Sequence, residues 1–208
     1  MFDFTSFLKD TLSLLAIVEP LGAVPVFLTL TASYGYAKRA RIAKKAAMAG
    51  FLILLCALVG GKLLLQVFGI SLSSLRVAGG LMFLVMGIQL VISEPPKITD
   101  SEIMEAESHT DVAVVPLALP VLSGPGAMGA VILLGDKGQS YVQIPKVGLI
   151  IGIVMTIAYF CFKLANPIGQ KLGVTGLNVL NRISGLIVLS IGVEFILAGV
   201  HQIWSSYN

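Results

Sequence analysis

The sequence has few charged residues. Only 12% of its 208 residues are charged, about half the usual share of roughly 25% in globular proteins. By contrast, 56% of the residues are hydrophobic, the mean hydropathy is +0.94, and long runs carry no charge. A soluble domain of this length cannot bury so much apolar surface. The composition therefore predicts an integral membrane protein in a lipid bilayer.

The sequence also lacks the motifs of disulfide-rich, metal-binding, ATP-driven and catalytic proteins. The two cysteines, Cys56 and Cys161, lie inside apolar runs without a Cys/His cluster, so we predict neither a disulfide framework nor a metal site. The pattern Gly-x-x-x-x-Gly-Lys-Ser/Thr is missing, so ATP is not expected to drive the protein directly. The apolar runs hold no His-Glu-x-x-His motif, paired aspartates or Ser–His pair. We predict no catalytic residue, no cofactor and, with a net charge of only +3, no nucleic-acid partner.

Six apolar segments are each close to the roughly 20 residues that a transmembrane helix needs. The predicted spans cover residues 11–31, 46–67, 74–92, 113–134, 146–165 and 183–203. The fold class is thus an all-α, polytopic membrane protein with six transmembrane helices. The connection between the first two spans carries Lys38, Arg39, Arg41, Lys44 and Lys45 and no acid. The positive-inside rule places that connection in the cytoplasm and both chain ends on the opposite side.

Two of the six segments have a composition that a straight helix does not tolerate. The first contains Glu19-Pro20-Leu21-Gly22-Ala23-Val24-Pro25, and the fourth contains three prolines and three glycines within residues 116–129. Proline removes a backbone donor, and glycine admits unusual backbone angles. Broken backbone inside a bilayer is tolerated only in contact with protein or a wet cavity. Two broken segments in corresponding halves indicate a transporter binding site. The predicted substrate-binding residues are Glu19, Pro20, Leu21, Gly22, Pro25, Ser123, Gly124, Pro125 and Gly126.

The two halves of the chain also match each other. Residues 22–24 correspond to 126–128, residues 68–71 to 172–175, and the glycines at 80 and 87 to those at 185 and 192, always about 104 to 105 residues apart. Because three spans are an odd number, the second copy must enter the membrane from the opposite side. This predicts two inverted-topology three-helix repeats with broken first and fourth helices. We assign residues 1–92 to the first repeat, 93–112 to an acidic cytoplasmic linker and 113–208 to the second.

Glu19 and Glu194 are the only acids inside the predicted spans, and an ionisable group in a membrane is a functional hypothesis. Glu19 could bind a substrate ammonium group, or take up a proton, because burial disfavours the charged form; a structural tie between helices is the alternative. Glu194, matched by Gln89, is either a coupling residue or a polar helix contact. Arg76 and Arg182 open the third helix of each repeat, and either reach lipid headgroups or pair with a carboxylate such as Glu194.

Four motifs resemble the MarC family of bacterial inner-membrane proteins, which includes the SnatA-type small neutral amino acid transporters. They are residues 19–27, 115–120, 123–127 and 176–182, and the resemblance covers almost the whole chain. It implies a six-helix protein of the bacterial inner membrane; with the charge pattern given above, this predicts that both termini lie in the periplasm. The family carries Asn-Pro or Asp-Pro and then Gly in its first helix, whereas this chain has Glu19 at the first of these positions.

Together, the residues and the resemblance predict a secondary transporter. Its small-molecule substrate would be a small neutral amino acid of the glycine or alanine type, and a proton or sodium ion would be the coupling ion. One alternative is an exporter of another small metabolite or a drug. Another is a membrane scaffold that transports nothing, for which Glu19 and the Pro/Gly segments would tolerate substitution.

Overall fold

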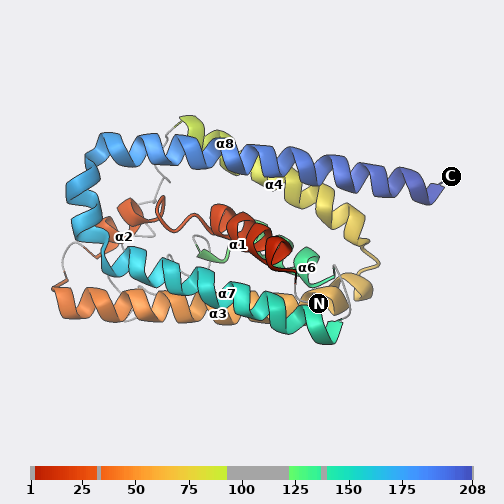
Figure 1. Cartoon of the computed structure of the whole chain (residues 1–208), viewed down its shortest axis with the longest axis horizontal. Helices are drawn as coiled ribbons and strands as arrows, with labels where there is room; N and C mark the ends of the chain where they lie inside the picture. The colour runs from red at the N-terminus through yellow and green to blue at the C-terminus, as the bar shows by residue number, and fades with distance from the viewer. Residues whose placement is uncertain (1–2, 32–33, 93–121, 137–139, 208) are drawn as a thin grey trace.

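The computed structural model describes residues 3–31, 34–92, 122–136 and 140–207, and the secondary structure in these ranges is entirely helical (Figure 1). The predicted acidic linker, residues 93–112, and the first part of the predicted fourth span, residues 113–121, lie outside them. The helices are α1 (Phe4–Val18), α2 (Val24–Leu30), α3 (Tyr36–Val67), α4 (Leu72–Ile92), α6 (Pro125–Gly135), α7 (Ser140–Lys163) and α8 (Ala165–Tyr207).

Four of the described helices are long and apolar enough to cross a membrane. They are α3, α4, residues Val142–Lys163 of α7 and residues Asn178–Ser205 of α8, and α6 is a shorter apolar helix. Their outer faces carry exposed large apolar side chains, for example Leu63, Val85 and Leu197. Such faces suit contact with lipid chains. The predicted all-helical, multi-pass class is therefore confirmed.

Helix α3 begins ten residues before the predicted second span, at Tyr36. The basic residues from Lys38 to Lys45, which precede the predicted second span, therefore lie on its first turns. The physical reason is local: residues 36–45 contain alanines and long unbranched basic side chains, which favour helix, and no proline or glycine.

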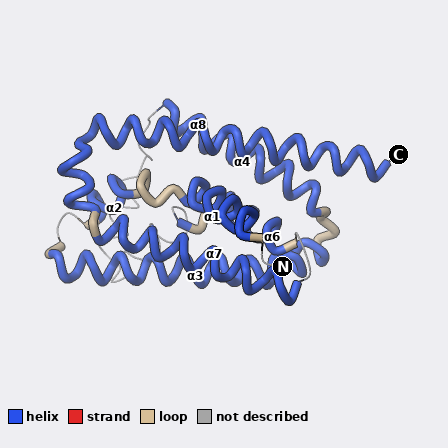
Figure 2. Tube along the Cα trace, viewed as in Figure 1, coloured by secondary structure: helices blue, strands red, loops and turns tan. Residues whose placement is uncertain are grey.

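The first predicted span is divided, as its composition predicts. Helix α1 ends at Val18, α2 starts at Val24, and Figure 2 shows the non-helical segment between them. Glu19 adopts the left-handed conformation, with φ 46° and ψ 57°. Pro20 follows it and has no N–H group to continue the helical ladder. The break leaves backbone groups near Glu19 outside a regular helix.

Helix α8 continues past the predicted sixth span at both ends and bends at Gly173. Gly173 has φ 60° and ψ −178°, angles that a residue with a side chain rarely adopts. Pro167 lies in the first turn of α8, where a missing N–H group costs little. The polar and proline residues at 166 and 167 thus begin a helix that turns back along the bundle (Figure 1).

In the view of Figure 1, the short helices α1, α2 and α6 lie between two pairs of long ones. Helices α3 and α7 pack together on one side, α4 and α8 on the other, and both α1 and α6 contact members of the two pairs. Phe27 of α2 is buried and stacks on Phe162 of α7, with ring centroids 4.8 Å apart. The broken backbone is therefore surrounded by protein, as a bilayer requires.

Helices α4 and α8 pack along an antiparallel seam. A Cβ atom added at Gly80 would lie 2.7 Å from the carbonyl oxygen of Gly192, and one added at Gly185 would lie 2.9 Å from that of Gly87. Small residues at such positions let two backbones approach directly. The four glycines that match between the two halves thus pack closely, and each backbone occupies the space that a side chain on the other would need.

We expect Gly80→Ala to destabilise the protein and Gly79→Ala not to. Gly79 is the adjacent residue of α4, but nothing lies within 4 Å of its added Cβ atom. Overpacking typically costs about 1–3 kcal/mol, whereas alanine in an open helical position gains up to about 1 kcal/mol over glycine. Thermal unfolding in detergent would compare the two variants. Equal midpoints for the two variants would show that the seam tolerates separation.

Candidate functional site

Glu19 is the buried acidic residue at the break between α1 and α2. Its side chain is only 7% exposed, and its backbone N–H donates a hydrogen bond to the Leu15 carbonyl at 2.9 Å. Ser184 of α8 hydrogen-bonds its carboxyl group. The other carboxyl oxygen, Oε1, is buried and has no hydrogen-bond partner among the described residues. A buried oxygen without a partner is costly, and it is a position where a ligand proton or ammonium group would be stabilised.

Because Gly22 has no side chain, it leaves room for the Glu19 carboxyl group. A Cβ atom at Gly22 would lie 2.8 Å from Cδ and 2.9 Å from Oε1 of Glu19. Any side chain at this residue would therefore push the carboxyl group away. Of the other predicted binding residues in this segment, Pro20 is buried, and Leu21 and Pro25 are half-buried.

The second predicted binding segment begins α6. Ser123 is fully buried, and Gly124 precedes the helix without a side-chain cap. Pro125 occupies the first turn, where its missing N–H group is tolerated. Gly126 lies against the ring of Phe83, 2.8 Å from an added Cβ atom. Because α6 packs on α1, both predicted segments lie in the central layer of the bundle.

The other predicted polar residues lie on α4 and α8. Gln89, Glu194 and Arg182 are exposed, and Arg76 donates a hydrogen bond to the side chain of Gln202 at 3.0 Å. Arg182 and Glu194 are twelve residues apart on α8, which is about 18 Å along a helix. Their side chains are too distant to pair, so the arginine–Glu194 ion pair that we considered does not form within α8.

An open polar cleft of about 620 Å³ lies between α1 and α8. Glu194 lines the cleft together with Ser6 and Ser13 of α1 and Ser190 of α8. Its lining consists of Asp3, Thr5, Ser6, Lys9, Asp10, Ser13, Ser190, Ile191, Glu194 and Phe195. The cleft is on the side of the bundle where the N-terminal end of α1 meets the C-terminal half of α8. Of the residues that line the cleft, Glu194 was predicted from the sequence as a polar site residue, and the others were not.

A buried ion pair lies beside this cleft. Lys146 of α7 contacts Asp10 of α1 at 3.0 Å and Ser6 at 3.2 Å, and the two charged side chains are only 15% and 7% exposed. Asp10 precedes the predicted first span, which starts at residue 11, yet it lies within a helix. Helix α1 begins at Phe4. The spacing of Ser6, Asp10 and Ser13 puts them on one helical face, and this spacing was the available signal.

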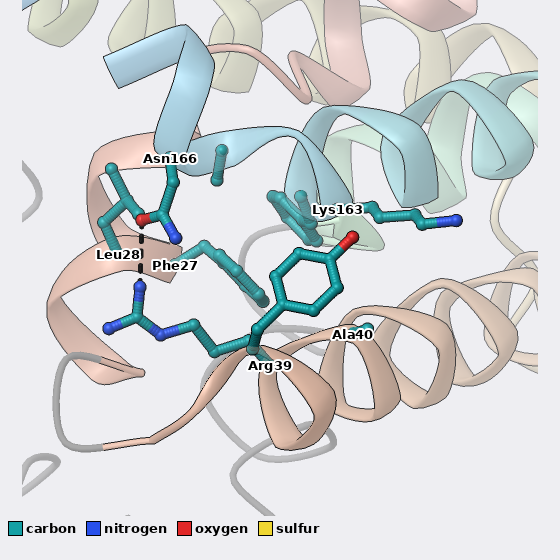
Figure 3. Close-up of a pocket in the computed structure, with 9 residues that line it drawn as sticks. Phe27, Leu28, Arg39, Ala40, Lys163 and Asn166 are labelled. Atoms are coloured by element: carbon teal, nitrogen blue, oxygen red, sulfur yellow. Dashed lines mark hydrogen bonds between the residues drawn. The ribbon is translucent and has the colours of Figure 1, made fainter. Parts of the chain in front are cut away.

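Arg39 links several parts of the chain at the opposite end of the bundle (Figure 3). Its guanidinium donates hydrogen bonds to the Thr31 carbonyl and to Asn166 Oδ1, both at 2.9 Å. Thr31 follows α2, and Asn166 lies at the start of α8, so one side chain ties three parts of the bundle together. The pocket beside it is lined in part by Phe27 and Phe162 and has a volume of only about 10 Å³.

A sequence profile described as "MarC family integral membrane protein" matches residues 4–204, nearly the entire chain. The chain belongs to the MarC family.

Relatives of this MarC family protein span almost its full length. A UPF0056 membrane protein of Buchnera aphidicola is 32% identical over 206 residues, covering 99% of this chain and 97% of its own. The UPF0056 membrane protein YhcE of Escherichia coli is 33% identical, with 98% and 95% covered. YvbG of Bacillus subtilis is 36% identical, with 91% of each chain covered. Their names give no substrate. No solved structure shows significant similarity to the chain.

The MarC family chain thus holds one buried carboxyl group at a helix break, and an open cleft on one side. The break supplies an unpartnered oxygen at Glu19 and helical backbone that stops at Val18. The first turn of α6 supplies N–H groups that have no partner within the helix. The unpartnered oxygen of Glu19 is a group that can bind an ammonium group. The N–H groups at the start of α6 can bind a carboxylate.

Proposed function

We propose that this MarC family protein is a secondary transporter of small neutral amino acids in the bacterial inner membrane, coupled to a proton or sodium gradient. One observation carries the proposal: the Glu19 carboxyl group is buried at the break between two helices, with Oε1 unpartnered among the described residues. Secondary transporters bind their substrates at such discontinuous helices. A buried carboxylate is expensive to keep in a membrane without a function.

The surroundings of Glu19 favour a small substrate. Gly22 lies in contact distance of the carboxyl group, and Gly126 in the second segment lies against Phe83. Neither position has room for an added methyl group without a shift. A ligand with a short side chain, such as glycine or alanine, fits this environment better than a large one. Its ammonium group would contact Glu19, and its carboxylate the N–H groups at the start of α6.

The glycine seam supports the inverted repeat that the sequence predicts. Gly80 and Gly185 hold corresponding places in the two halves, as do Gly87 and Gly192. In the structure Gly80 meets Gly192, and Gly87 meets Gly185. This reciprocal pattern is the one produced by a two-fold axis in the membrane plane. It favours six membrane crossings and alternating access between two related halves.

The ends of the bundle support the proposed orientation. Both termini lie toward one end of the bundle, and the basic first turns of α3 lie toward the other (Figure 1). By the positive-inside rule the basic end is cytoplasmic. Both termini would then be periplasmic.

Uptake into liposomes tests the proposed function. Purified protein should accumulate labelled glycine and alanine when a proton or a sodium gradient is imposed, and should not do so without a gradient. Exchange of internal for external label without a gradient would check for a carrier that is not coupled. If folded protein moves neither amino acid under either gradient nor by exchange, the amino acid proposal is wrong. The function is then better explained as export of another solute, or as a membrane scaffold that transports nothing.

A further inference from the structure

The α1–α8 cleft and the break at Glu19 lie along one seam. Ser184 of α8 bonds to Glu19, while Ser190 and Glu194 of the same helix line the cleft together with Ser13 of α1. Ser13 lies six residues before Glu19 on α1, and Ser190 lies six residues after Ser184 on α8. The two helices therefore run antiparallel, and the two pairs of residues are in the same register. Six residues span about 9 Å. The cleft therefore ends about two helical turns from the buried carboxyl group.

The chemistry of the cleft is that of a site for a cation. Asp3, Asp10 and Glu194 outnumber the single Lys9 in its lining. Asp10 is paired with Lys146, and the Asp3 carboxylate accepts a hydrogen bond from the Thr5 N–H at 3.0 Å. Among the residues with described positions, Glu194 makes no ion pair. Its carboxylate is thus available to a ligand.

The two ends of the bundle differ in openness. The cleft holds about 620 Å³, whereas the pocket beside Arg39 holds about 10 Å³, and Arg39 bonds to Thr31 and Asn166 at that end. Of these two pockets, the cleft is the one with room for a small solute.

We propose that the α1–α8 cleft is the water-filled entrance through which a small solute with an ammonium group reaches Glu19, and that Glu194 is the first carboxylate it contacts. This inference deepens the proposed function by adding an entrance and a residue that selects for charge. It rests on that function for the identity of the solute, but not for the water access or the charge preference.

Cysteine modification tests the entrance. Single cysteines at Ser13 and at Ser190 would be made in a Cys56→Ser, Cys161→Ser background and treated with cationic and anionic methanethiosulfonate reagents. Both cysteines should react from the aqueous side, the cationic reagent about tenfold faster, as expected for an acidic cleft. Ser205→Cys, exposed near the end of α8 outside the cleft lining, is the matched control. Unreactive cysteines at both cleft positions beside a reactive control would overturn the proposal, whatever the protein transports.

Solute protection tests the ligand chemistry. Glycine or methylammonium near its half-saturating concentration should slow modification in the cleft about twofold by mass action, without affecting Ser205→Cys, and acetate should not. Glu194→Gln should raise the methylammonium concentration needed for protection about fivefold, the size of one exposed ion pair. Protection by methylammonium but not glycine would support the entrance and reject the amino acid. Protection by acetate, or by neither ammonium compound, would overturn the entrance.

Discussion

Glu19→Gln is expected to lower the initial rate of gradient-driven amino acid uptake by about 10- to 100-fold, because a hydrogen bond to a charged group contributes about 1.5–3 kcal/mol. Glutamine has nearly the same size and can still bond to Ser184, so the packing of the break should persist. It lacks the negative charge that a substrate ammonium group or a coupling proton requires. Initial rates in liposomes under each gradient, with the unfolding midpoint of the same preparation, would measure the effect.

Gly22→Ala separates the position of the carboxyl group from its charge. The added methyl group would lie 2.8 Å from Cδ of Glu19, so the carboxyl group must move although its charge stays. Uptake should fall in this variant as well. Gly129→Ala in α6 is the control, because Gly129 is also buried but has nothing within 4 Å of an added Cβ atom.

Two outcomes would contradict a functional role for Glu19. If Glu19→Gln keeps parental uptake, the carboxyl group only ties helices together through Ser184. If Glu19→Gln unfolds the protein, Glu19→Asp becomes the informative variant, since it keeps the charge on a shorter side chain. An aspartate variant that folds but transports no better than glutamine would place the requirement on shape instead of charge.

The break in the first span was predictable because its cause is local. Pro20, Gly22 and Pro25 disturb the helix through missing donors and free backbone angles, and no distant contact is needed for α1 to end at Val18. The close approach at Gly80 and Gly192 was predictable for a similar reason, since paired glycines at a seven-residue spacing mark one helix face.

The cleft and its ion pair could not be predicted in the same way. They depend on which helices become neighbours. Asp10 and Lys146 are 136 residues apart in the chain, and neither carries a motif. Hydropathy also misplaced their surroundings: the polar residues of α1 before residue 11 lowered the apolar score, so the predicted span excluded Asp10 although α1 begins at Phe4. Hydropathy detects the lipid-facing part of a helix, whereas these residues face other helices.

The ion pair of Asp10 and Lys146 should be a major source of stability at the cleft side. We expect Lys146→Met to lower the free energy of unfolding by about 3 kcal/mol, since removing one partner leaves the other charge buried and uncompensated. The side chain of Asp10 is only 7% exposed although it lines the cleft, so water can replace the lost ammonium group only in part. Thermal or denaturant unfolding in detergent would measure the change.

Lys62→Met provides the matched comparison, because it also removes one lysine from a lysine–aspartate pair. Lys62 and Asp136 are 2.7 Å apart, closer than Lys146 and Asp10 at 3.0 Å, but their side chains are 53% and 32% exposed. Exposed pairs contribute only about 0–1 kcal/mol. If the distance between the charges decided how much the pair stabilises the fold, Lys62→Met would lower the free energy of unfolding more. If burial decides it, Lys146→Met will lower it more.

Asp10→Asn combined with Lys146→Met should recover part of the stability lost in Lys146→Met, because the uncompensated charge is then gone. A double variant as unstable as Lys146→Met alone would show that Lys146 stabilises the bundle through its packing and its contact with Ser6, and not through its charge.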